Sequence, residues 1–457
     1  MQRYRQNDHP WREGRIFGYI FDVDEEVREV IRQAYTSFLT ENALDPTVFP
    51  SLLEMEREVV AIAASHLQGD GEVVGNFTSG GTESIFLAVK AARDKFREEN
   101  PHLTQIQMIL PVTAHAAFHK AAHYLDVEAI VVPVDPRTFK ADVEAMKDAI
   151  TESTFLLVAS APSYSHGVID PIEEIGQLAL ENNIYFHVDA CIGGFLLPFW
   201  RKLGRDIPSF DFSVEGVSSI SMDFHKYAYA AKGASVVLYR DKGLRKYQIF
   251  TCSHWTGYAM VNPTVQSSKS GGPLASCWAL LNYLGEEGYL ELSRKTLVAT
   301  EKISQGIERI GGLYILGEPE MSLLAVASDE VNVFHIIDEM RARGWYIQPQ
   351  FARGGGKENF HLSITAAHFS LVDPFLEDLE ESVESARRLP PPEEVDLGEL
   401  KVEDLDEVSM GAFLEMVGIR EGRLPSRMAG IHQMLNSSSP ELVEAFLRYF
   451  SNELYSL

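Results

Sequence analysis

The sequence predicts an α/β protein with a mainly parallel sheet in a large domain and a smaller C-terminal α+β domain. Short apolar runs alternate with amphipathic stretches over residues 83–240, and this alternation is typical of a parallel sheet that helices cover on both faces. The pattern changes near residue 285, where a long amphipathic helix is expected. The length of 457 residues is also too great for one ordinary domain.

The chain divides into four regions. We predict an N-terminal segment, a large domain, a small C-terminal domain, and an acidic linker with a helical tail, over residues 1–50, 51–284, 285–386 and 387–457, respectively. The linker prediction rests on "PPPEEVDLGELKVEDLDE", in which prolines precede a dense acidic run. The tail prediction rests on "SPELVEAFLRYFSNELYSL", whose apolar residues recur at helical spacing.

Each element of the two domains follows from its own pattern. Apolar residues at helical spacing predict a first helix over 83–99. Continuous apolar runs predict buried strands, with shorter helices between most of them, over 106–112, 128–134, 154–160, 184–190, 217–221 and 234–240. In the small domain, strands are expected over 323–328 and 359–365, on either side of a helix over 331–343.

The composition excludes several classes of protein. The formal net charge is -26, from 66 acidic and 40 basic residues, which argues against nucleic-acid binding and against docking on an anionic membrane. No uncharged apolar stretch is long enough to predict a transmembrane helix. Three cysteines show no metal-ligand spacing and cannot all pair, so we expect a reducing, cytoplasmic location.

A glycine-rich segment, "NFTSGGTESIF" (76–86), opens the helix predicted over 83–99. Glycines let the backbone approach a ligand closely, and the unpaired N–H groups at a helix N-terminus attract an anion. The segment therefore predicts a phosphate site. The alternative is that Ser79 or Thr82 is an ordinary helix cap.

Two charged positions follow apolar strands further along the chain. Asp189 ends the apolar strand expected over 184–190, where a carboxylate needs a cationic or hydrogen-bonding partner. His225 and Lys226 follow the strand expected over 217–221, and a partly desolvated lysine can act as a nucleophilic amine. The alternatives are a structural ion pair for Asp189 and an ordinary surface position for Lys226.

Together these three features match the needs of pyridoxal 5'-phosphate. The phosphate of this cofactor suits a helix N-terminus, its pyridine nitrogen suits a carboxylate, and its aldehyde condenses with a lysine amine. His115, in "TAHAAFHKAAHYL", could lie flat against the ring. His119 and His123 have helical spacing with His115, but no acidic or cysteine partner completes a metal site, so no metal is predicted.

The chain resembles the group II decarboxylase superfamily of fold-type-I pyridoxal-phosphate enzymes, and within it the sphingosine-1-phosphate lyases. The similarity runs from about residue 11 to about residue 385. The segments that carry it are "TSGGTES", "AHAAFHKAAHY", "SHGVIDPIEEI", "HVDACIGGF", "FDFSVEGVSSISMDFHKYAYAAKGASVVLYRDK" and "SKSGG". "SHGVIDP" and the second lysine of "HKYAYAAKG" favour the lyases over ordinary decarboxylases.

The resemblance implies a role for each residue around the cofactor. It implies that Lys226 carries the cofactor, that Asp189 pairs with the pyridinium nitrogen and that His115 stacks on the ring. The cofactor phosphate is expected on Gly81, Thr82 and His225, together with Ser268 of the partner subunit. Enzymes of this fold are usually dimers with active sites at the interface, so the resemblance also implies a homodimer.

The resemblance implies a carbon–carbon lyase that acts on a small-molecule amine. The expected substrate is a 2-amino-3-hydroxy compound such as a phosphorylated sphingoid base, and the products are an aldehyde and an amine. Lys232 and Tyr164 are the candidates for proton transfer at the substrate. A group II amino-acid decarboxylase is the alternative, because the same cofactor chemistry serves both reactions. A non-catalytic binding protein with this fold is a third possibility.

Two positions depart from the lyase pattern at the expected substrate end. The lyases read approximately N-P-L-H-P-D-x-F-P, whereas this chain has "NALDPTVFP", with Asp45 in place of the histidine. Phe21, in "IFGYIF", stands where the lyases carry a tyrosine. An anion repels a phosphate, and phenylalanine lacks a hydroxyl donor, so we expect a remodelled substrate end.

A glycine-rich stretch, "RGGGKENF" (353–360), is a candidate for a mobile substrate loop. Its glycines permit motion, and Arg353 or Lys357 would then meet a carboxylate or phosphate of the substrate. An ordinary surface loop is the alternative.

Overall fold

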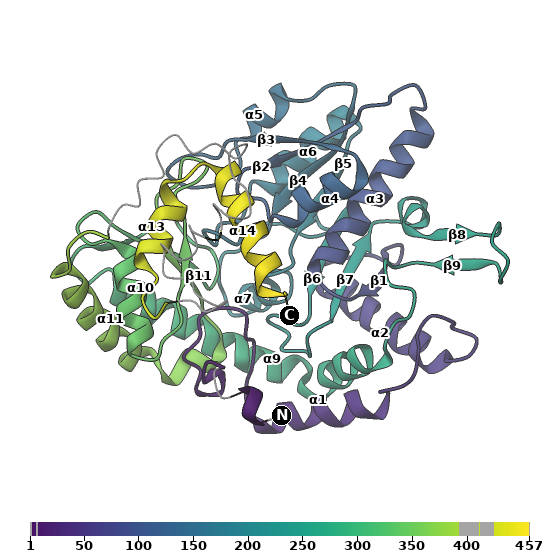
Figure 1. Cartoon of the computed structure of the whole chain (residues 1–457). Helices are drawn as coiled ribbons and strands as arrows, with labels where there is room; N and C mark the ends of the chain where they lie inside the picture. Colours follow the sequence, from purple (N-terminus) through teal and green to yellow (C-terminus); the bar gives the residue numbers. More distant parts are fainter. Residues whose placement is uncertain (1, 6–7, 393–410, 412–424, 457) are drawn as a thin grey trace.

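A seven-stranded and a four-stranded sheet organise the chain in the computed structural model, which describes residues 2–5, 8–392, 411 and 425–456 (Figure 1). The strands of the larger sheet are β1 (Val74–Thr78), β2 (Gln107–Pro111), β3 (Glu128–Val132), β4 (Thr154–Ser160), β5 (Tyr185–Asp189), β6 (Ser219–Asp223) and β7 (Ser235–Tyr239). They lie in the order β1-β7-β6-β5-β4-β2-β3, and β7 is antiparallel to both of its neighbours while the strands from β6 to β3 are parallel. The prediction of a mainly parallel sheet is confirmed.

Helices cover both faces of this sheet. One face carries α3 (Gly81–Glu99) and α4 (Ala117–Leu125), and the other carries α2 (Pro50–His66), α6 (Ile172–Asn182) and α7 (Leu196–Lys202). Successive side chains of a strand point to opposite faces, so Ile109 and Leu157 join one apolar core while Met108 and Val158 join the other. This cover on both faces explains the continuous apolar runs that predicted the strands.

Shorter elements complete the large domain. They are α5 (Val143–Asp148), α8 (Lys242–Arg245), the 3-10 helix η3 (Lys246–Gln248), β8 (Phe250–Cys252) and β9 (Met260–Asn262). The last two strands form a hairpin that projects from the large domain (Figure 1). Neither this hairpin nor β1 was predicted from the sequence.

The small domain begins within a long helix, α9 (Gly271–Ile307). Gly285 interrupts this helix with φ 55° and ψ -168°, at the point where the sequence pattern changes. The small sheet is antiparallel in the order β10-β11-β13-β12, and its strands are β10 (Leu313–Ile315), β11 (Leu323–Ser328), β12 (Gln348–Gln350) and β13 (Asn359–Ser363). The helices of this domain are α10 (Val333–Ala342), η4 (Ala366–Ser370) and α11 (Val372–Arg387).

The N-terminal segment packs against both domains. It contains η1 (Gln2–Arg5), η2 (Trp11–Glu13) and α1 (Glu25–Ser37), and α1 packs along α9. Between η2 and α1, Phe17 donates its N–H to the carbonyl oxygen of Tyr346 over 2.9 Å and accepts a bond from the N–H of Ser363 over 3.1 Å. These bonds hold the chain around Phe17 between the ends of two small-domain strands.

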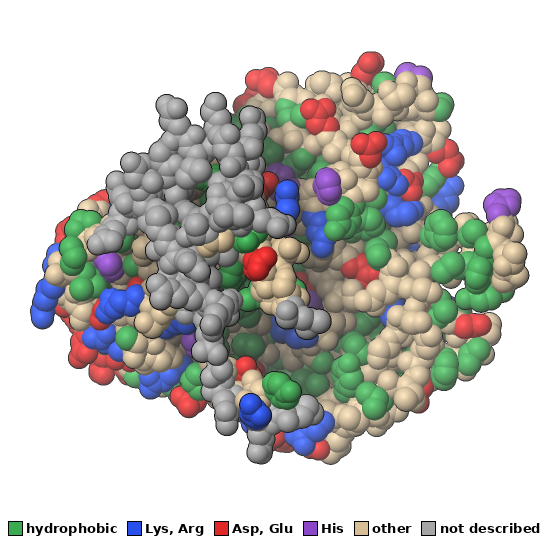
Figure 2. Space-filling model, viewed as in Figure 1, with side chains coloured by type: hydrophobic (Ala, Val, Ile, Leu, Met, Phe, Trp, Pro, Cys, Tyr) green, Lys and Arg blue, Asp and Glu red, His purple; other side chains and the backbone are tan. Residues whose placement is uncertain are grey.

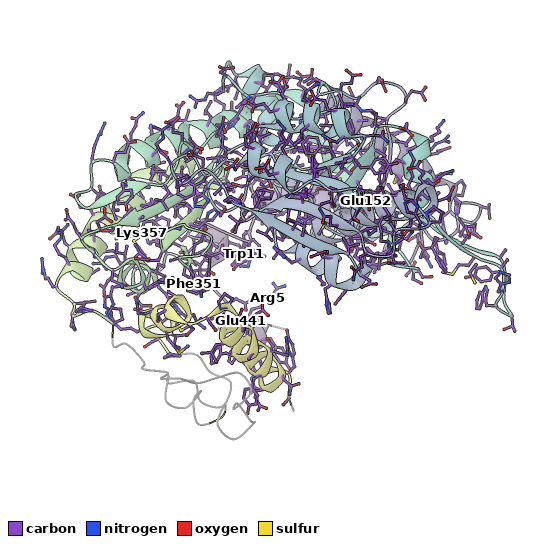
Figure 3. The ribbon with its side chains drawn as sticks, turned by 90° about the horizontal axis from the view of Figure 1, so that it is seen from above. Arg5, Trp11, Glu152, Phe351, Lys357 and Glu441 are labelled. Atoms are coloured by element: carbon purple, nitrogen blue, oxygen red, sulfur yellow. The ribbon has the colours of Figure 1, made fainter. Side chains whose placement is uncertain are left out.

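The C-terminal tail forms α13 (Ala429–Ser437) and α14 (Pro440–Leu454). α14 corresponds to the predicted tail helix, whereas the acidic part of the predicted linker lies outside the described residues. Phe351 packs against α13, with its ring 6.3 Å from the ring of His432 (Figure 3). Among the described helices, none combines the length and the hydrophobicity that crossing a membrane requires.

Candidate active site

The carboxyl ends of three strands meet at one edge of the large sheet. Asp189 is the last residue of β5, Asp223 is the last residue of β6, and α3 begins at Gly81, shortly after β1 ends. These ends border a pocket of about 540 Å3. Open sheets of this kind bind ligands at the carboxyl ends of their strands, so the topology itself marks the pocket as a candidate active site.

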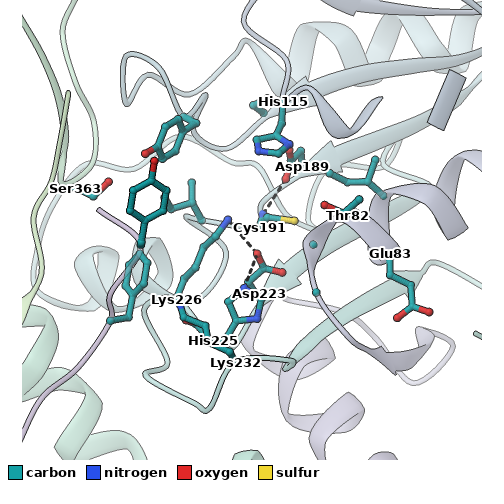
Figure 4. Close-up of a pocket in the computed structure, with 18 of the residues that line it drawn as sticks. Thr82, Glu83, His115, Asp189, Cys191, Asp223, His225, Lys226, Lys232 and Ser363 are labelled. Atoms are coloured by element: carbon teal, nitrogen blue, oxygen red, sulfur yellow. Dashed lines mark hydrogen bonds and ion pairs between the residues drawn. The ribbon is translucent and has the colours of Figure 1, made fainter. Parts of the chain in front are cut away.

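Lys226 points into this pocket and forms an ion pair at its base (Figure 4). Its Nζ lies 3.0 Å from Oδ2 of Asp223, and Nε2 of His225 lies 3.6 Å from the same oxygen. Burial acts to lower the pKa of Lys226, but the carboxylate of Asp223 outweighs it, so the pKa lies above its ordinary value. Conversely, burial acts to raise the pKa of Asp223, and the charge of Lys226 holds it below its ordinary value.

A chain of hydrogen bonds supports Asp189 from behind. Oδ1 of Asp189 accepts from the N–H of Cys191 over 3.0 Å and from the hydroxyl of Ser221 over 3.4 Å. The ring nitrogens of His187 contact the hydroxyls of Ser221 and Ser219 at 3.1 and 2.8 Å. Burial lowers the pKa of His187 to about 4, so the ring is neutral at physiological pH. The hydrogen bonds from His187 through Ser221 therefore bring no positive charge close to Asp189.

The first turn of α3 forms another wall of the pocket. Ser79, Gly81 and Thr82 line it, and Glu83 fixes the turn by accepting from the N–H of Ser79 over 2.6 Å and from the N–H of Val265 over 2.8 Å. A Cβ atom at position 81 would lie 2.8 Å from Oδ2 of Asp223, so only glycine fits there. The backbone can therefore approach a ligand closely at the helix N-terminus.

The pocket residues fit pyridoxal phosphate. Nδ1 of His225 is buried and has no hydrogen-bond partner within the described part of the chain, so it is free to meet a ligand. Nδ1 of His115 accepts from the N–H of Ala117 over 3.1 Å, which orients the ring at the edge of the pocket. Figure 4 shows His115 and Thr82 on one side of Lys226 and Ser363 on the other. A lysine, a buried carboxylate and a helix N-terminus around one pocket are the groups that this cofactor needs.

The opposite wall combines residues of the small domain and the N-terminal segment with Lys232 and Tyr164 of the large domain. Nζ of Lys232 donates to the carbonyl oxygen of His225 over 3.1 Å and lies 5.1 Å from the ring centroid of Phe21. Burial of its ammonium group, and the charge of Lys226, lower the pKa of Lys232 to about 8. Tyr164 lies on the same wall, and burial raises the pKa of its hydroxyl.

Most of the predicted site residues line this one pocket. They are Lys226, Asp189, His115, Gly81, Thr82, His225, Lys232, Tyr164 and Phe21. Sequence reasoning missed several further lining residues, among them Asp223, Tyr19, Gln348 and Ser363. Asp223 had a local signal, because it precedes Lys226 by three residues. The other three come from distant segments, and no local pattern marks them.

The structure does not bring Arg353 or Lys357, the predicted substrate ligands, to the pocket of its own chain. The guanidinium of Arg353 donates four hydrogen bonds to backbone carbonyl oxygens, three of which belong to residues 435–438 at the end of α13 and just beyond it. Lys357 forms an ion pair with Asp329 on the surface of the small domain. Arg353 therefore stabilises the position of the C-terminal helices. Neither Arg353 nor Lys357 lines the pocket.

The structure does not bring Asp45 or Ser268 to the pocket of its own chain. The carboxylate of Asp45 closes a local turn by accepting from the N–H and the hydroxyl of Thr47 over 2.8 and 2.6 Å. Asp45 lines a second cavity of about 1000 Å3 beside the β8–β9 hairpin, and Ser268 lies between Ser267 and Lys269, which line the same cavity. Asp45 thus lies outside the Lys226 pocket of its own subunit.

Known proteins resemble the chain over most of its length. The family described as "Pyridoxal-dependent decarboxylase conserved domain" matches residues 11–327. A second family, described as "Pyridoxal-dependent enzyme, C-terminal putative HTH domain", matches residues 386–453. The sphingosine-1-phosphate lyase of Arabidopsis thaliana is 42% identical over 400 residues, which cover 86% of this chain and 72% of that protein. Sphingosine-1-phosphate lyase 1 of Rattus norvegicus is 40% identical, with 85% and 68% covered.

Solved structures show the same relationship. The sphingosine-1-phosphate lyase of Burkholderia pseudomallei superposes with a TM-score of 0.79 at 36% identity, and the match covers 82% of this chain and 87% of that one. The glutamate decarboxylase of Lactobacillus brevis superposes with a TM-score of 0.76 at 21% identity, over 85% of this chain and 92% of that one. The second likeness supports the fold alone.

Proposed function

Because the chain belongs to the pyridoxal-dependent decarboxylase superfamily and, within it, to the sphingosine-1-phosphate lyases, we propose that it cleaves a phosphorylated sphingoid base to a fatty aldehyde and phosphoethanolamine. It is a fold-type-I lyase that uses pyridoxal phosphate. One observation carries the proposal: Lys226, Asp189 and the N-terminus of α3 surround a single pocket.

Each residue around the pocket has a separate task in this proposal. Pyridoxal phosphate, when bound, supplies an electron-accepting ring that stabilises the negative charge left on a substrate carbon when one of its bonds breaks. Asp189 holds the ring nitrogen protonated, and Ser221 keeps the carboxylate in place from behind. The N–H groups of the first turn of α3, with Thr82 and His225, hold the phosphate. Lys226 supplies the amine that anchors the cofactor.

Lys232 and Tyr164 have different roles toward the hydroxyl group of the substrate. Burial raises the pKa of Tyr164, so this residue stays protonated at neutral pH and acts through hydrogen bonds. The pKa of Lys232 is lowered to about 8, so a useful fraction of its amine is neutral near that pH. A base works best when its pKa is close to the working pH. We therefore assign the role of proton acceptor to Lys232.

In this proposal, the part of the site that holds the phosphate end of the substrate differs from that of other lyases. Phe21 packs edge-on against the ring of Tyr227, with centroids 5.0 Å apart, and supports Lys232 through its ring face. Phenylalanine at this position thus holds a cation and donates no hydrogen bond of its own. Replacing Phe21 with tyrosine together with Asp45→His is expected to raise kcat/KM for a phosphorylated base at least about tenfold, because each added donor to a phosphate contributes about 1.5–3 kcal/mol. A double variant with unchanged kcat/KM would show that phosphate is already held well.

We further propose that the enzyme is a homodimer in which Asp45 and Ser268 of one subunit reach the pocket of the other. The β8–β9 hairpin and its flanks carry exposed apolar side chains, and such patches commonly mark interfaces (Figure 2). These side chains are Phe250, Trp255, Tyr258, Val261 and Val265. Sedimentation is expected to give a dimer for the wild type and a monomer for Val261→Glu. A monomeric wild type would contradict the proposal.

A cytoplasmic location also belongs to the proposal. Its support is that Cys191, Cys252 and Cys277 are all unpaired, as cysteines generally are in a reducing compartment. Fractionation of cells that express the full chain tests it, and recovery of the protein with membranes would contradict it.

The reaction itself is tested with purified holoenzyme. The enzyme is incubated with a phosphorylated sphingoid base and, separately, with a panel of amino acids, and both aldehyde and carbon dioxide are measured. Aldehyde from the base, with no carbon dioxide from the amino acids, is the expected result. Carbon dioxide release without aldehyde would assign the enzyme to the amino-acid decarboxylases. Lys226→Ala is the matched control for background cleavage, because it lacks the anchoring amine.

A further inference from the structure

Three polar side chains from three parts of the chain meet at the wall of the pocket. The hydroxyl of Tyr164 donates to Oε1 of Gln348 over 2.7 Å, and Nε2 of Gln348 donates to the hydroxyl oxygen of Tyr19 over 3.1 Å. All three line the same pocket as Lys226 and Lys232. We refer to this chain of hydrogen bonds as the Tyr164–Gln348–Tyr19 bridge.

The bridge joins segments that are far apart in the sequence. Tyr164 follows β4 of the large domain, Gln348 opens β12 of the small domain, and Tyr19 belongs to the N-terminal segment. Tyr19 adopts a φ of 61°, a left-handed conformation that is unfavourable for a non-glycine residue unless its surroundings hold it. Gln348 and the ring of Tyr346, 5.8 Å away, are the surroundings that hold it.

The bridge determines whether the hydroxyl of Tyr164 can donate a hydrogen bond to a ligand or only accept one. A tyrosine hydroxyl has one hydrogen, and Tyr164 donates it to Gln348, so only its oxygen lone pairs remain for the pocket. The ring of Tyr164 also packs on His361 with centroids 4.4 Å apart, which limits its rotation. Because burial raises the pKa of Tyr164, the hydrogen stays in place at neutral pH. Tyr164 is thus an acceptor toward the ligand.

We propose that Gln348 is a positioning residue that makes Tyr164 the hydrogen-bond acceptor for the hydroxyl group next to the amine-bearing carbon while the substrate binds. The hydrogen of that hydroxyl passes to Lys232 only in the cleavage step. This inference rests on the proposed function and names the feature of the substrate that the pocket recognises. A hydroxyl can donate to Tyr164, whereas a carboxylate only accepts and would meet the lone pairs of the tyrosine unfavourably. The bridge therefore favours a 2-amino-3-hydroxy compound over a plain amino acid.

The test compares two ligands that differ only in this hydroxyl. Holoenzyme is mixed by stopped flow with a 2-amino-3-hydroxyalkyl phosphate or with its 3-deoxy counterpart, and Kd is taken from the fast change in cofactor absorbance that precedes cleavage. We expect the wild type to prefer the hydroxylated ligand by roughly 2- to 12-fold, the range that one net hydrogen bond supplies. Gln348→Met, close in volume but without the acceptor oxygen, is expected to lose this preference.

Three further variants test whether Gln348 acts through Tyr164. Tyr164→Phe is expected to lose the preference to the same extent, and the double variant Gln348→Met with Tyr164→Phe is expected to lose no more than either alone. Gln348→Glu retains an oxygen that accepts from Tyr164 and is expected to keep the preference. It also serves as the second variant if the methionine variant fails to fold, which thermal unfolding would reveal.

The outcomes that overturn the proposal are specific. Gln348→Met with an intact preference would show that Gln348 does not act through Tyr164, and so would Gln348→Glu with the preference lost. A wild type that binds both ligands equally would remove the proposed recognition altogether. Aldehyde release by the wild type is scored separately, so a failure of the lyase reaction is distinguished from a failure of the bridge.

Discussion

Asp223 and Lys226 face each other at the base of the pocket, with 3.0 Å between Oδ2 and Nζ. The contact has two opposite consequences for the free lysine. The carboxylate holds the side chain in the pocket, and it also raises the pKa of Lys226, so the amine is protonated before the cofactor arrives. Only the neutral amine can attack an aldehyde, so Asp223 controls how readily the apoenzyme takes up its cofactor.

Asp223→Asn is therefore expected to speed covalent uptake of pyridoxal phosphate at neutral pH. The substitution keeps the shape of the side chain and removes its charge, which lowers the pKa of Lys226. Each unit by which that pKa falls raises the neutral fraction about tenfold. The measurement is the rate at which the absorbance of bound cofactor appears in apoenzyme between about pH 6 and pH 9, on either side of neutrality. An unchanged pH profile would contradict the role given to Asp223.

The second prediction concerns Lys232 and the pH dependence of turnover. The neutral amine is the active form of a base, and its fraction rises as pH rises through the pKa of about 8. We expect kcat/KM of the wild type to rise over the same range. Lys232→Met is expected to lose this rise and to lower kcat/KM about 10²- to 10⁴-fold, the usual contribution of a general base.

Lys232→Arg is the matched control, because arginine keeps the positive charge but does not lose its proton in this range. If Lys232 only attracts the substrate phosphate, the arginine variant retains most of the wild-type rate. If Lys232 accepts a proton, the arginine variant is as slow as the methionine variant. The first of these results would remove the assignment.

The sequence predicted the parallel sheet well because the pattern there has a single physical cause. Both faces of the sheet are covered, so strands such as β4 (Thr154–Ser160) are apolar throughout and stand out against amphipathic helices. The same topology explains why Asp189 and Lys226 could be placed near a ligand. Residues at or just after the carboxyl end of neighbouring parallel strands meet at one edge, so local sequence and topology together locate them.

Other parts of the site could not be predicted in this way. Gln348 and Tyr19 reach the pocket from the small domain and the N-terminal segment, and their positions depend on long-range packing. The composition of "RGGGK" is equally typical of a substrate loop and of a surface turn. Which of the two it forms depends on α13, whose last carbonyl groups accept the hydrogen bonds of Arg353.

The third prediction concerns the support behind Asp189. Ser221→Ala removes one hydrogen bond to the carboxylate and leaves Nε2 of His187 without its partner. We expect a fall in turnover of roughly 3- to 10-fold, since this bond is long at 3.4 Å and a typical hydrogen bond contributes about 0.5–1.5 kcal/mol net. Asp189→Asn is expected to cost several orders of magnitude. Ser219→Ala, which contacts only the other nitrogen of His187, is the control and is expected to have the smallest effect. Equal losses of turnover in both serine variants would show that the hydrogen bond from Ser221 to Asp189 has no specific role in catalysis.

The fourth prediction follows from the hydrogen bonds that Arg353 donates to the C-terminal segment. Arg353→Ala is expected to leave KM unchanged and to expose the C-terminal helices to proteases, because its side chain donates to carbonyl groups at the end of α13 and beyond. Limited proteolysis followed by mass spectrometry measures the rate of loss of residues 425–456. Lys357→Ala removes a charge from the same loop without touching α13 and serves as the control. A raised KM in the arginine variant would return Arg353 to the substrate site.

The last prediction concerns the stability of the fold beside the second cavity. Nζ of Lys269 lies 2.8 Å from Oε2 of Glu56, and both side chains are nearly buried, with 11% and 13% of their surface exposed. Burial acts to raise the pKa of Glu56, but the ammonium group of Lys269 outweighs it and holds the pKa below its ordinary value of 4.5. The pair therefore contributes stability that is present above pH 4.5 and is lost as pH falls through the folded pKa.

Lys269→Met is expected to lower the free energy of unfolding at pH 7 by about 3–5 kcal/mol, because Glu56 is left charged and without its cation. The difference from the wild type is expected to shrink as pH falls below about 5, where protonation of Glu56 removes the unpaired charge. Denaturant unfolding at a series of pH values measures both effects. Lys202→Met breaks an ion pair with Glu286 whose side chains are 48% and 63% exposed, and is expected to change the free energy of unfolding little at any pH. If the two variants lose similar amounts, the Lys269–Glu56 pair behaves as an ordinary surface contact and the assignment is wrong.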